Sequence, residues 1–274
     1  MLPAPSERGA ALVSGASSGL GLSIATALAR RGYNIVLTAR RGDRLRALAD
    51  KLTAEFSVRA EPVPCDLADR SAPEQLQHAI DAMGFDIDVL VNNAGLGSTG
   101  RFQDADLELQ LAIVRVKVET AVALTGRFLP GMLTRGRGAI LNVSSTTGFQ
   151  PLANNATYAA ANAFVLSFTE SLHIDLAGTG VSATALCPGP VKTELWSESG
   201  PTASAVASLL PDFLWMTPDE VAEAGIEGLE ARKRVVVPGT MNRLGALGGQ
   251  HAPRSLLLRL TAAIGATPDG QQQP

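Results

Sequence analysis

Short apolar runs alternate with amphipathic stretches along most of this 274-residue chain, and this alternation constrains its fold more than any other feature. Strands joined by helices form βαβ units, which build a parallel sheet with helices on both faces. We therefore expect an α/β fold with a doubly wound sheet of about seven strands. The predicted strands are Ala10–Ser14, Asn34–Thr38, Ala60–Pro64, Val89–Asn92, Gly138–Ser144, Val181–Pro188 and Arg234–Pro238. The predicted helices cover about 19–31, 43–55, 72–83, 107–135, 155–178 and 217–231.

Composition excludes several classes of protein. The chain is 46% hydrophobic, which is enough for a full core, yet no run reaches the roughly 18 apolar residues of a membrane span. Its net charge is −3 without a basic patch, so we expect no nucleic-acid partner. Cys65 and Cys187 form no CxxC, no His/Cys/carboxylate cluster has metal-ligand spacing, and the N-terminus has no signal-peptide pattern. A cytoplasmic location is expected.

A glycine-rich turn follows the first predicted strand. In the segment Ser14-Gly15-Ala16-Ser17-Ser18-Gly19-Leu20-Gly21 the glycines permit a tight turn and close approach of a ligand to the backbone. The helix that follows offers free N–H groups and the positive end of its dipole to a pyrophosphate. This strand–turn–helix context predicts a dinucleotide site, although a connector without a ligand has the same composition.

The end of the second predicted strand indicates which dinucleotide is preferred. A carboxylate there would bind a ribose 2′-hydroxyl and favour NAD(H). This chain has Arg40 and Arg41 instead, and a guanidinium can hold a 2′-phosphate. NADP(H) is therefore expected over NAD(H), the alternative being two solvated arginines.

Four further motifs occur in the order and spacing that are typical of the short-chain dehydrogenase/reductase family. With them the chain resembles this family over about residues 8–240. They are Cys65-Asp66-Leu67, Asn92-Asn93-Ala94-Gly95, Asn142-Val143-Ser144-Ser145 and Pro188-Gly189-Pro190-Val191-Lys192-Thr193. The resemblance implies a Rossmann-type fold, hydride transfer with a nicotinamide cofactor, and a homodimer or homotetramer. It implies a cofactor site made of Gly15, Ser17, Ser18, Gly19, Leu20, Gly21, Arg40, Arg41, Asp66, Leu67, Asn93, Ala94, Gly95, Tyr158, Pro188, Gly189, Val191 and Thr193.

We expect three regions along the chain. Residues 1–239 form the dinucleotide-binding and catalytic domain, in which 190–216 resembles the family's substrate-binding lid. Residues 240–265 form a C-terminal helical extension that covers the pocket, packs on a neighbouring subunit or lies on a membrane surface. Residues 266–274 form a flexible tail.

The family's catalytic residues are an Asn, a Ser, a Tyr and a Lys. Ser145 and Tyr158 match the serine and the tyrosine, but Asn162 stands where the family has lysine. A tyrosine of pKa near 10 needs about 4 kcal/mol to exchange protons at neutral pH, which a cation about 4 Å away supplies at an effective dielectric near 20. Asn162 is neutral and cannot supply it.

Lys117 is the candidate for the missing cation. It lies in the predicted helix 107–135, where the family places its catalytic Asn, on a face with Val114, Val118 and Ala121 that should pack inward. We hypothesise that Asn and Lys have exchanged positions. Lys117 then lowers the pKa of Tyr158, Asn162 takes the polar bridging role, Ser145 donates to the substrate oxygen and Tyr158 is the acid/base. In the alternatives Lys117 extends to the rim, or catalysis is lost and the chain is a nucleotide-binding sensor or assembly protein.

The region 190–216 also bears on the substrate. It holds both tryptophans, Trp196 and Trp215, with Phe213 and Met216 nearby. An apolar lid favours a small hydrophobic ketone, aldehyde or alcohol. The same residues are equally compatible with simple packing of the segment or a subunit contact.

Overall fold

The computed structural model describes residues 2–199, 203, 207–208 and 210–265. Its centre is a seven-stranded sheet whose strands run parallel, in the order β3-β2-β1-β4-β5-β6-β7. The predicted α/β, doubly wound class is confirmed. The strands are β1 (Gly9–Ser14), β2 (Asn34–Ala39), β3 (Ala60–Pro64), β4 (Asp86–Asn92), β5 (Gly138–Val143), β6 (Val181–Leu186) and β7 (Val235–Val236).

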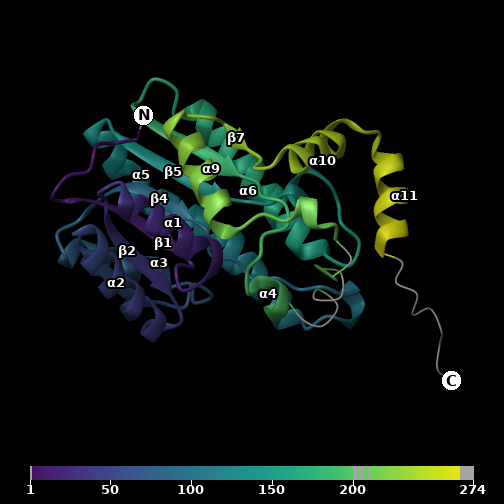
Figure 1. Cartoon of the computed structure of the whole chain (residues 1–274), viewed down its shortest axis with the longest axis horizontal. Helices are drawn as coiled ribbons and strands as arrows, with labels where there is room; N and C mark the ends of the chain where they lie inside the picture. The colour runs from purple at the N-terminus through teal and green to yellow at the C-terminus, as the bar shows by residue number, and fades with distance from the viewer. Residues whose placement is uncertain (1, 200–202, 204–206, 209, 266–274) are drawn as a thin grey trace.

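Helices cover both faces of this sheet (Figure 1). They are α1 (Gly19–Arg30), α2 (Gly42–Phe56), α3 (Ala72–Ala82), α4 (Leu107–Val114), α5 (Thr120–Arg135), α6 (Ala156–Asp175), α7 (Leu195–Glu198), α9 (Pro218–Glu230), α10 (Thr240–His251) and α11 (Arg254–Gly265). Alternate strand residues point to opposite faces, so the core has two layers. One layer packs against α1, α2 and α9, and the other against α3, α5 and the end of α6.

Helix α1 shows how the pattern of the sequence becomes packing. Leu20, Ile24 and Leu28 recur every four residues and therefore lie on one face. That face meets the sheet, where Ile24 and Leu28 are fully buried. Each such side chain contributes about 1.5–3 kcal/mol by leaving water. This burial fixes the start of α1, and with it the glycine-rich turn, against the sheet.

The strand order places the functional motifs together. The chain crosses from β3 back to the middle of the sheet, so that β1 lies between β2 and β4. In a doubly wound sheet, ligands bind at the carboxyl ends of the strands beside such a switch point. The glycine-rich turn follows β1, the segment 93–95 follows β4, and Ser145 lies two residues after β5.

The predicted helix 107–135 is not α-helical throughout. Residues Arg115–Glu119 form a π-helical turn between α4 and α5. The extra residue of a π turn rotates the following side chains about the helix axis. Val116, Lys117, Thr120 and Ala121 are buried, whereas the predicted inward residues Val114 and Val118 are only partly buried. Lys117 does point inward, as predicted.

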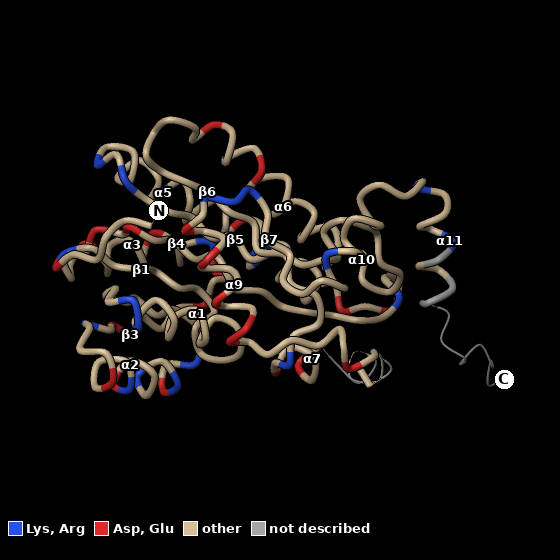
Figure 2. Tube along the Cα trace, turned by 45° about the horizontal axis from the view of Figure 1, so that its top comes forward, with Lys and Arg blue, Asp and Glu red and all other residues tan. Residues whose placement is uncertain are grey.

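The C-terminal helices α10 and α11 lie at the opposite end of the molecule from α2 (Figure 1). The predicted tail, 266–274, lies outside the described residues. Basic and acidic positions are interspersed along the trace, and α2 carries both signs (Figure 2). Within the described part of the chain, no helix combines the length and the apolar character needed to cross a bilayer.

Candidate functional site

Two of the three predicted glycines are required by close packing in the turn. Gly15 has φ +68°, and a Cβ there would lie 2.8 Å from the side-chain nitrogen of Asn93. A Cβ on Gly21 would collide with the carbonyl oxygen of Gly15. Gly19, with φ +53°, lies under Thr193, whose methyl carbon would be 3.0 Å from an added Cβ. The turn therefore packs tightly against the segments that follow β4 and β6.

Ser14 joins the turn to the segment after β4, a role that sequence reasoning missed. Its hydroxyl donates to the carbonyl of Val91 at 3.1 Å and accepts from the backbone N–H groups of Asn93 and Ala94 at 2.9 and 3.1 Å. The Asn93 side chain donates to the carbonyl of Ser14 at 2.9 Å. Ser14 is the first residue of the glycine-rich segment, and this position was the signal from which its role could have been found. These bonds hold β1 and β4 together at the switch point.

The N-terminus of α1 can receive an anion. The Ser18 side chain does not cap it, and its first turn contains no acidic residue. The first N–H groups of a helix lack intrahelical partners and carry the positive end of the dipole. Together with the glycine cradle, this end of α1 fits a pyrophosphate.

Of the two predicted arginines, the structure brings Arg41 to the turn. Its Nε donates to the hydroxyl of Ser17 at 3.1 Å, and its Nη2 donates to the hydroxyl of Ser18 at 2.6 Å. Arg40 is exposed. Asp66 is also exposed, and its carboxylate accepts from the N–H of Ala68. Arg41 is therefore the residue best placed to meet a 2′-phosphate.

Tyr158 lies in the first turn of α6, and Ser145 lies two residues after β5. The side chains of Ser145 and Asn162 interact with the phenol and lower its pKa, but burial outweighs them and the pKa of Tyr158 is raised. The expectation that Lys117 lowers this pKa is therefore wrong for this geometry, because Lys117 is not among the groups that act on the phenol. A phenol of raised pKa stays protonated at neutral pH but is a weaker proton donor than a free tyrosine.

Lys117 is a buried cation on the π turn. It is 8% exposed, and its Nζ donates to the carbonyl of Val143 at 2.6 Å. A Cβ added to Gly95 would lie 3.6 Å from this Nζ. Burial lowers the Lys117 pKa to about 8, an effect that the nearby Cys187 thiol opposes. Extension to the solvent rim is therefore excluded.

Asn162 lies one helical turn after Tyr158 and is fully buried. Its side-chain nitrogen donates to the backbone carbonyl of Tyr158 at 2.9 Å. The backbone carbonyl of Asn162 accepts from the Ser144 hydroxyl at 2.8 Å. Its Oδ1 is buried without a hydrogen-bond partner. An unpaired buried acceptor costs about 1–3 kcal/mol. It is retained beside the phenol, which is typical of a functional site.

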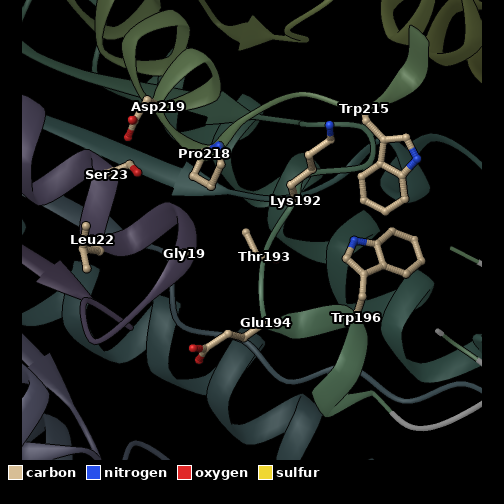
Figure 3. Close-up of a pocket in the computed structure, with 10 residues that line it drawn as sticks. All are labelled: Gly19, Leu22, Ser23, Lys192, Thr193, Glu194, Trp196, Trp215, Pro218 and Asp219. Carbon is tan, nitrogen blue, oxygen red and sulfur yellow. The ribbon is translucent and has the colours of Figure 1, made fainter. Parts of the chain in front are cut away.

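The two tryptophans pack together, with ring centroids 5.2 Å apart. Their indole N–H groups donate to the carbonyls of Val191 and Leu210. Both rings line an open groove of about 750 Å³ that passes Lys192, Thr193 and Gly19 (Figure 3). Ser145, Tyr158 and Lys117 are not among its lining residues. The groove therefore adjoins the glycine turn rather than the catalytic candidates.

The Lys117 pKa makes stability depend on pH. The folded value of about 8 lies below the ordinary 10.5, so the unfolded chain binds more protons between these two values. The free energy of unfolding should therefore rise with pH, by about 2 kcal/mol between pH 7 and pH 9.5. Urea unfolding at the two pH values measures this change. Lys117→Met should lack this contribution, and an equal rise in the variant would assign it to other groups.

No group of three or more His, Cys, Asp or Glu side chains suited to a metal ion occurs among the residues that the structure describes.

The family model described as short chain dehydrogenase matches residues 9–204. An uncharacterised oxidoreductase of Myxococcus xanthus is 43% identical over 185 residues, which cover 68% of this chain and 73% of that protein. A putative ketoacyl reductase of Streptomyces coelicolor is 34% identical, covering 87% of this chain and 96% of its own length. Among solved structures, a short-chain dehydrogenase from Sphingobium yanoikuyae in complex with NADPH has a TM-score of 0.78 and 29% identity, covering 97% of this chain and 98% of that chain.

Proposed function

Because the chain belongs to the short-chain dehydrogenase family, we propose that it is an NADP(H)-dependent oxidoreductase that interconverts a hydrophobic ketone or aldehyde with its alcohol. One observation carries the proposal. The carboxyl edge of the sheet holds both the glycine turn with Arg41 and the pair of Ser145 and Tyr158. A dinucleotide site and a proton donor thus lie on the same edge.

The residues present fit NADP(H). The turn at Gly15, Gly19 and Gly21 and the uncapped start of α1 would hold the pyrophosphate, and Arg41 would hold the 2′-phosphate. The similar Sphingobium yanoikuyae enzyme was solved with NADPH, which supports this choice. When bound, the nicotinamide supplies or accepts the hydride.

Tyr158 acts as the acid/base. Its phenol is protonated at neutral pH, which is the form that donates to a carbonyl oxygen in the direction of reduction. Ser145 interacts with this phenol and would donate a hydrogen bond to the same substrate oxygen. The pair thus polarises the carbonyl and delivers the proton as the oxygen becomes an alkoxide.

In our proposal Lys117 is the residue that holds a proton at the catalytic site, and Asn162 orients the phenol. A pKa of about 8 leaves the amine mostly protonated at pH 7 yet able to release a proton, which suits acid–base exchange near neutral pH. The exchange of the Asn and Lys positions stays a prediction. It is supported by the burial of Lys117 on a π turn and by the contact of Asn162 with the phenol.

The substrate class is proposed from chemistry near the site. The aromatic pair Trp196 and Trp215, which borders the glycine turn, supports a hydrophobic carbonyl compound. The similar Streptomyces coelicolor protein is described as a ketoacyl reductase. We also propose a cytoplasmic, self-associating enzyme. Exposed apolar side chains on the helical surface support self-association, namely Leu107, Phe164 and Ile174.

A steady-state assay tests the function. Oxidation of NADPH and of NADH is followed by absorbance against a panel of aliphatic, aromatic and polycyclic ketones and aldehydes. We expect turnover with hydrophobic carbonyls and a preference for NADPH. Arg41→Ala should raise the KM for NADPH by roughly ten- to a hundredfold and leave that for NADH nearly unchanged, because only NADPH carries the phosphate.

A non-catalytic nucleotide-binding protein is the second candidate. The raised pKa of Tyr158 and the neutral Asn162 at the family's lysine position favour it. Tight binding of NADPH without turnover of any panel carbonyl, or of any alcohol with NADP⁺, would establish this candidate and reject the enzyme.

A further inference from the structure

An ion-pair cluster links α7 to the start of α2. Arg41 Nη1 lies 2.9 Å from a carboxylate oxygen of Glu194 and 3.3 Å from one of Glu198. Arg44 Nη1 lies 2.9 Å from the same oxygen of Glu194. Glu194 immediately precedes α7, and Glu198 is its last residue. Two carboxylates at the ends of one short helix are therefore attached to arginines next to the second strand.

The Arg41 guanidinium is fully engaged between two segments. Its Nε and Nη2 face the hydroxyls of Ser17 and Ser18 in the glycine turn, while its Nη1 faces Glu194 and Glu198. This single side chain thus connects the turn with α7. In Figure 3 the Glu194 carboxylate points away from Trp196 and Trp215. Glu194 lines the same groove as the two tryptophans, and its carboxylate points from there to Arg41 and Arg44.

Carboxylate and phosphate compete for the same guanidinium. Both present oxygens that match the planar N–H donors of arginine. Arg41 and Arg44 hold the pKa of Glu194 below its usual value, so this carboxylate stays ionised at neutral pH. A 2′-phosphate that approaches Arg41 therefore meets a negative charge already bound there, and the two cannot share Nη1 without repulsion.

We propose that Glu194 and Glu198 are specificity-determining residues that compete with the cofactor 2′-phosphate for Arg41, so that NADP(H), but not NAD(H), detaches α7 from the glycine turn. The inference rests on the proposed NADP(H) site and adds a second effect of the phosphate. Besides contributing binding energy, the phosphate replaces the two carboxylates at Arg41 and so frees α7. A dinucleotide without the phosphate leaves the ion pairs intact.

The chain carries its own reporter for this exchange. Its only two tryptophans are Trp196, inside α7, and Trp215, which packs against it. Intrinsic tryptophan emission therefore reports on α7 and on the segment of Trp215 that packs against it. The nucleotide 2′,5′-ADP carries the 2′-phosphate without a nicotinamide, and 5′-AMP is the matched nucleotide without it. Neither probe requires turnover.

The experiment measures calorimetric affinity and tryptophan emission for both nucleotides on the full chain. We expect 2′,5′-ADP, but not 5′-AMP, to shift the emission. In Glu194→Gln/Glu198→Gln the emission before ligand should equal that of the liganded native protein. The affinity for 2′,5′-ADP should rise roughly three- to tenfold, since each exposed ion pair that must be broken is weak. Glu227→Gln, which neutralises an exposed carboxylate on α9, should behave as the native chain.

The outcomes separate the inference from the function on which it rests. If 2′,5′-ADP binds but the double variant binds it equally or more weakly, the carboxylates support Arg41 and the competition is rejected, while the NADP(H) site stands. If 2′,5′-ADP binds no better than 5′-AMP to the native chain and to the variant, both the phosphate site and the competition are rejected. An unchanged affinity for 5′-AMP in the double variant shows that its fold is intact.

Discussion

Replacing Lys117 by methionine is expected to slow carbonyl reduction by roughly a hundredfold or more, while making the folded protein more stable at neutral pH. Methionine has a similar length and fills the same buried space without a charge or an exchangeable proton. The variant lacks the Lys117 amine, which we propose holds a proton at the catalytic site. Steady-state kcat and urea unfolding at pH 7 measure the two effects on the same preparation.

The stability gain follows from two opposing terms. The lowering of the Lys117 pKa from 10.5 to about 8 corresponds to about 3 kcal/mol against the charged form in the folded state. Loss of the hydrogen bond to the Val143 carbonyl costs about 1–2 kcal/mol. The net gain at pH 7 is therefore about 1–2 kcal/mol. It should shrink or change sign at pH 9.5, where the native lysine is largely neutral.

The dependence of the rate on pH distinguishes a proton-holding lysine from a merely structural one. The native kcat should show an inflection near the Lys117 pKa of about 8, and Lys117→Met should lack it. Lys51→Met, at an exposed lysine on α2, is the control for removal of a positive charge. A Lys117→Met variant that keeps the native kcat and its pH profile would show that this residue has no part in the reaction.

Exchanging the two residues back is expected to restore a rate that either change alone destroys. Lys117→Asn should lose roughly as much activity as Lys117→Met. Adding Asn162→Lys places an amine one helical turn after Tyr158, where the resembled family has its lysine. The double variant should recover to within roughly tenfold of the native kcat, because the pocket regains one amine and one amide.

Unfolding measurements accompany this exchange because Asn162 is fully buried and lysine is larger. Asn162→Lys alone should be the least stable variant, since it buries two amines on the same edge of the sheet. The coupling between the two positions is the quantity of interest. If the double variant folds and remains as slow as Lys117→Asn, the two positions are not interchangeable and the exchanged set of catalytic residues is wrong.

The local sequence pattern was sufficient to predict the helices and strands of the fold. The spacing of Leu20, Ile24 and Leu28 predicts α1, and the short apolar runs predict the strands, because period and length are properties of neighbouring residues. The ends were less accurate. Strand β4 begins at Asp86 rather than Val89, since Asp88 is fully buried between strand neighbours and paired with Arg137. A buried carboxylate gives no apolar signal in the sequence.

The candidate site was predictable where chemistry depends on residue type. Three glycines at the start of a helix and two arginines after the second strand indicate a phosphate site, whatever the fold of the rest of the chain. The choice between Arg40 and Arg41 was not predictable, because it depends on which side chain reaches Ser17 and Ser18 from another strand. The contact of Glu194 with Arg44 was not predictable either, because the two residues are 150 positions apart in sequence and form a hydrogen bond only in the folded chain.

The sequence by itself determined an α/β chain with a glycine turn, a serine, a tyrosine and a lysine on the inward face of a helix, since these are matters of residue identity and spacing. The tertiary structure decided what that lysine faces. Lys117 lies on a π turn, where burial near Val143, Gly95 and Cys187 lowers its pKa. It also decided that burial raises the pKa of Tyr158. Desolvation depends on every surrounding element, so no stretch of sequence encodes it locally.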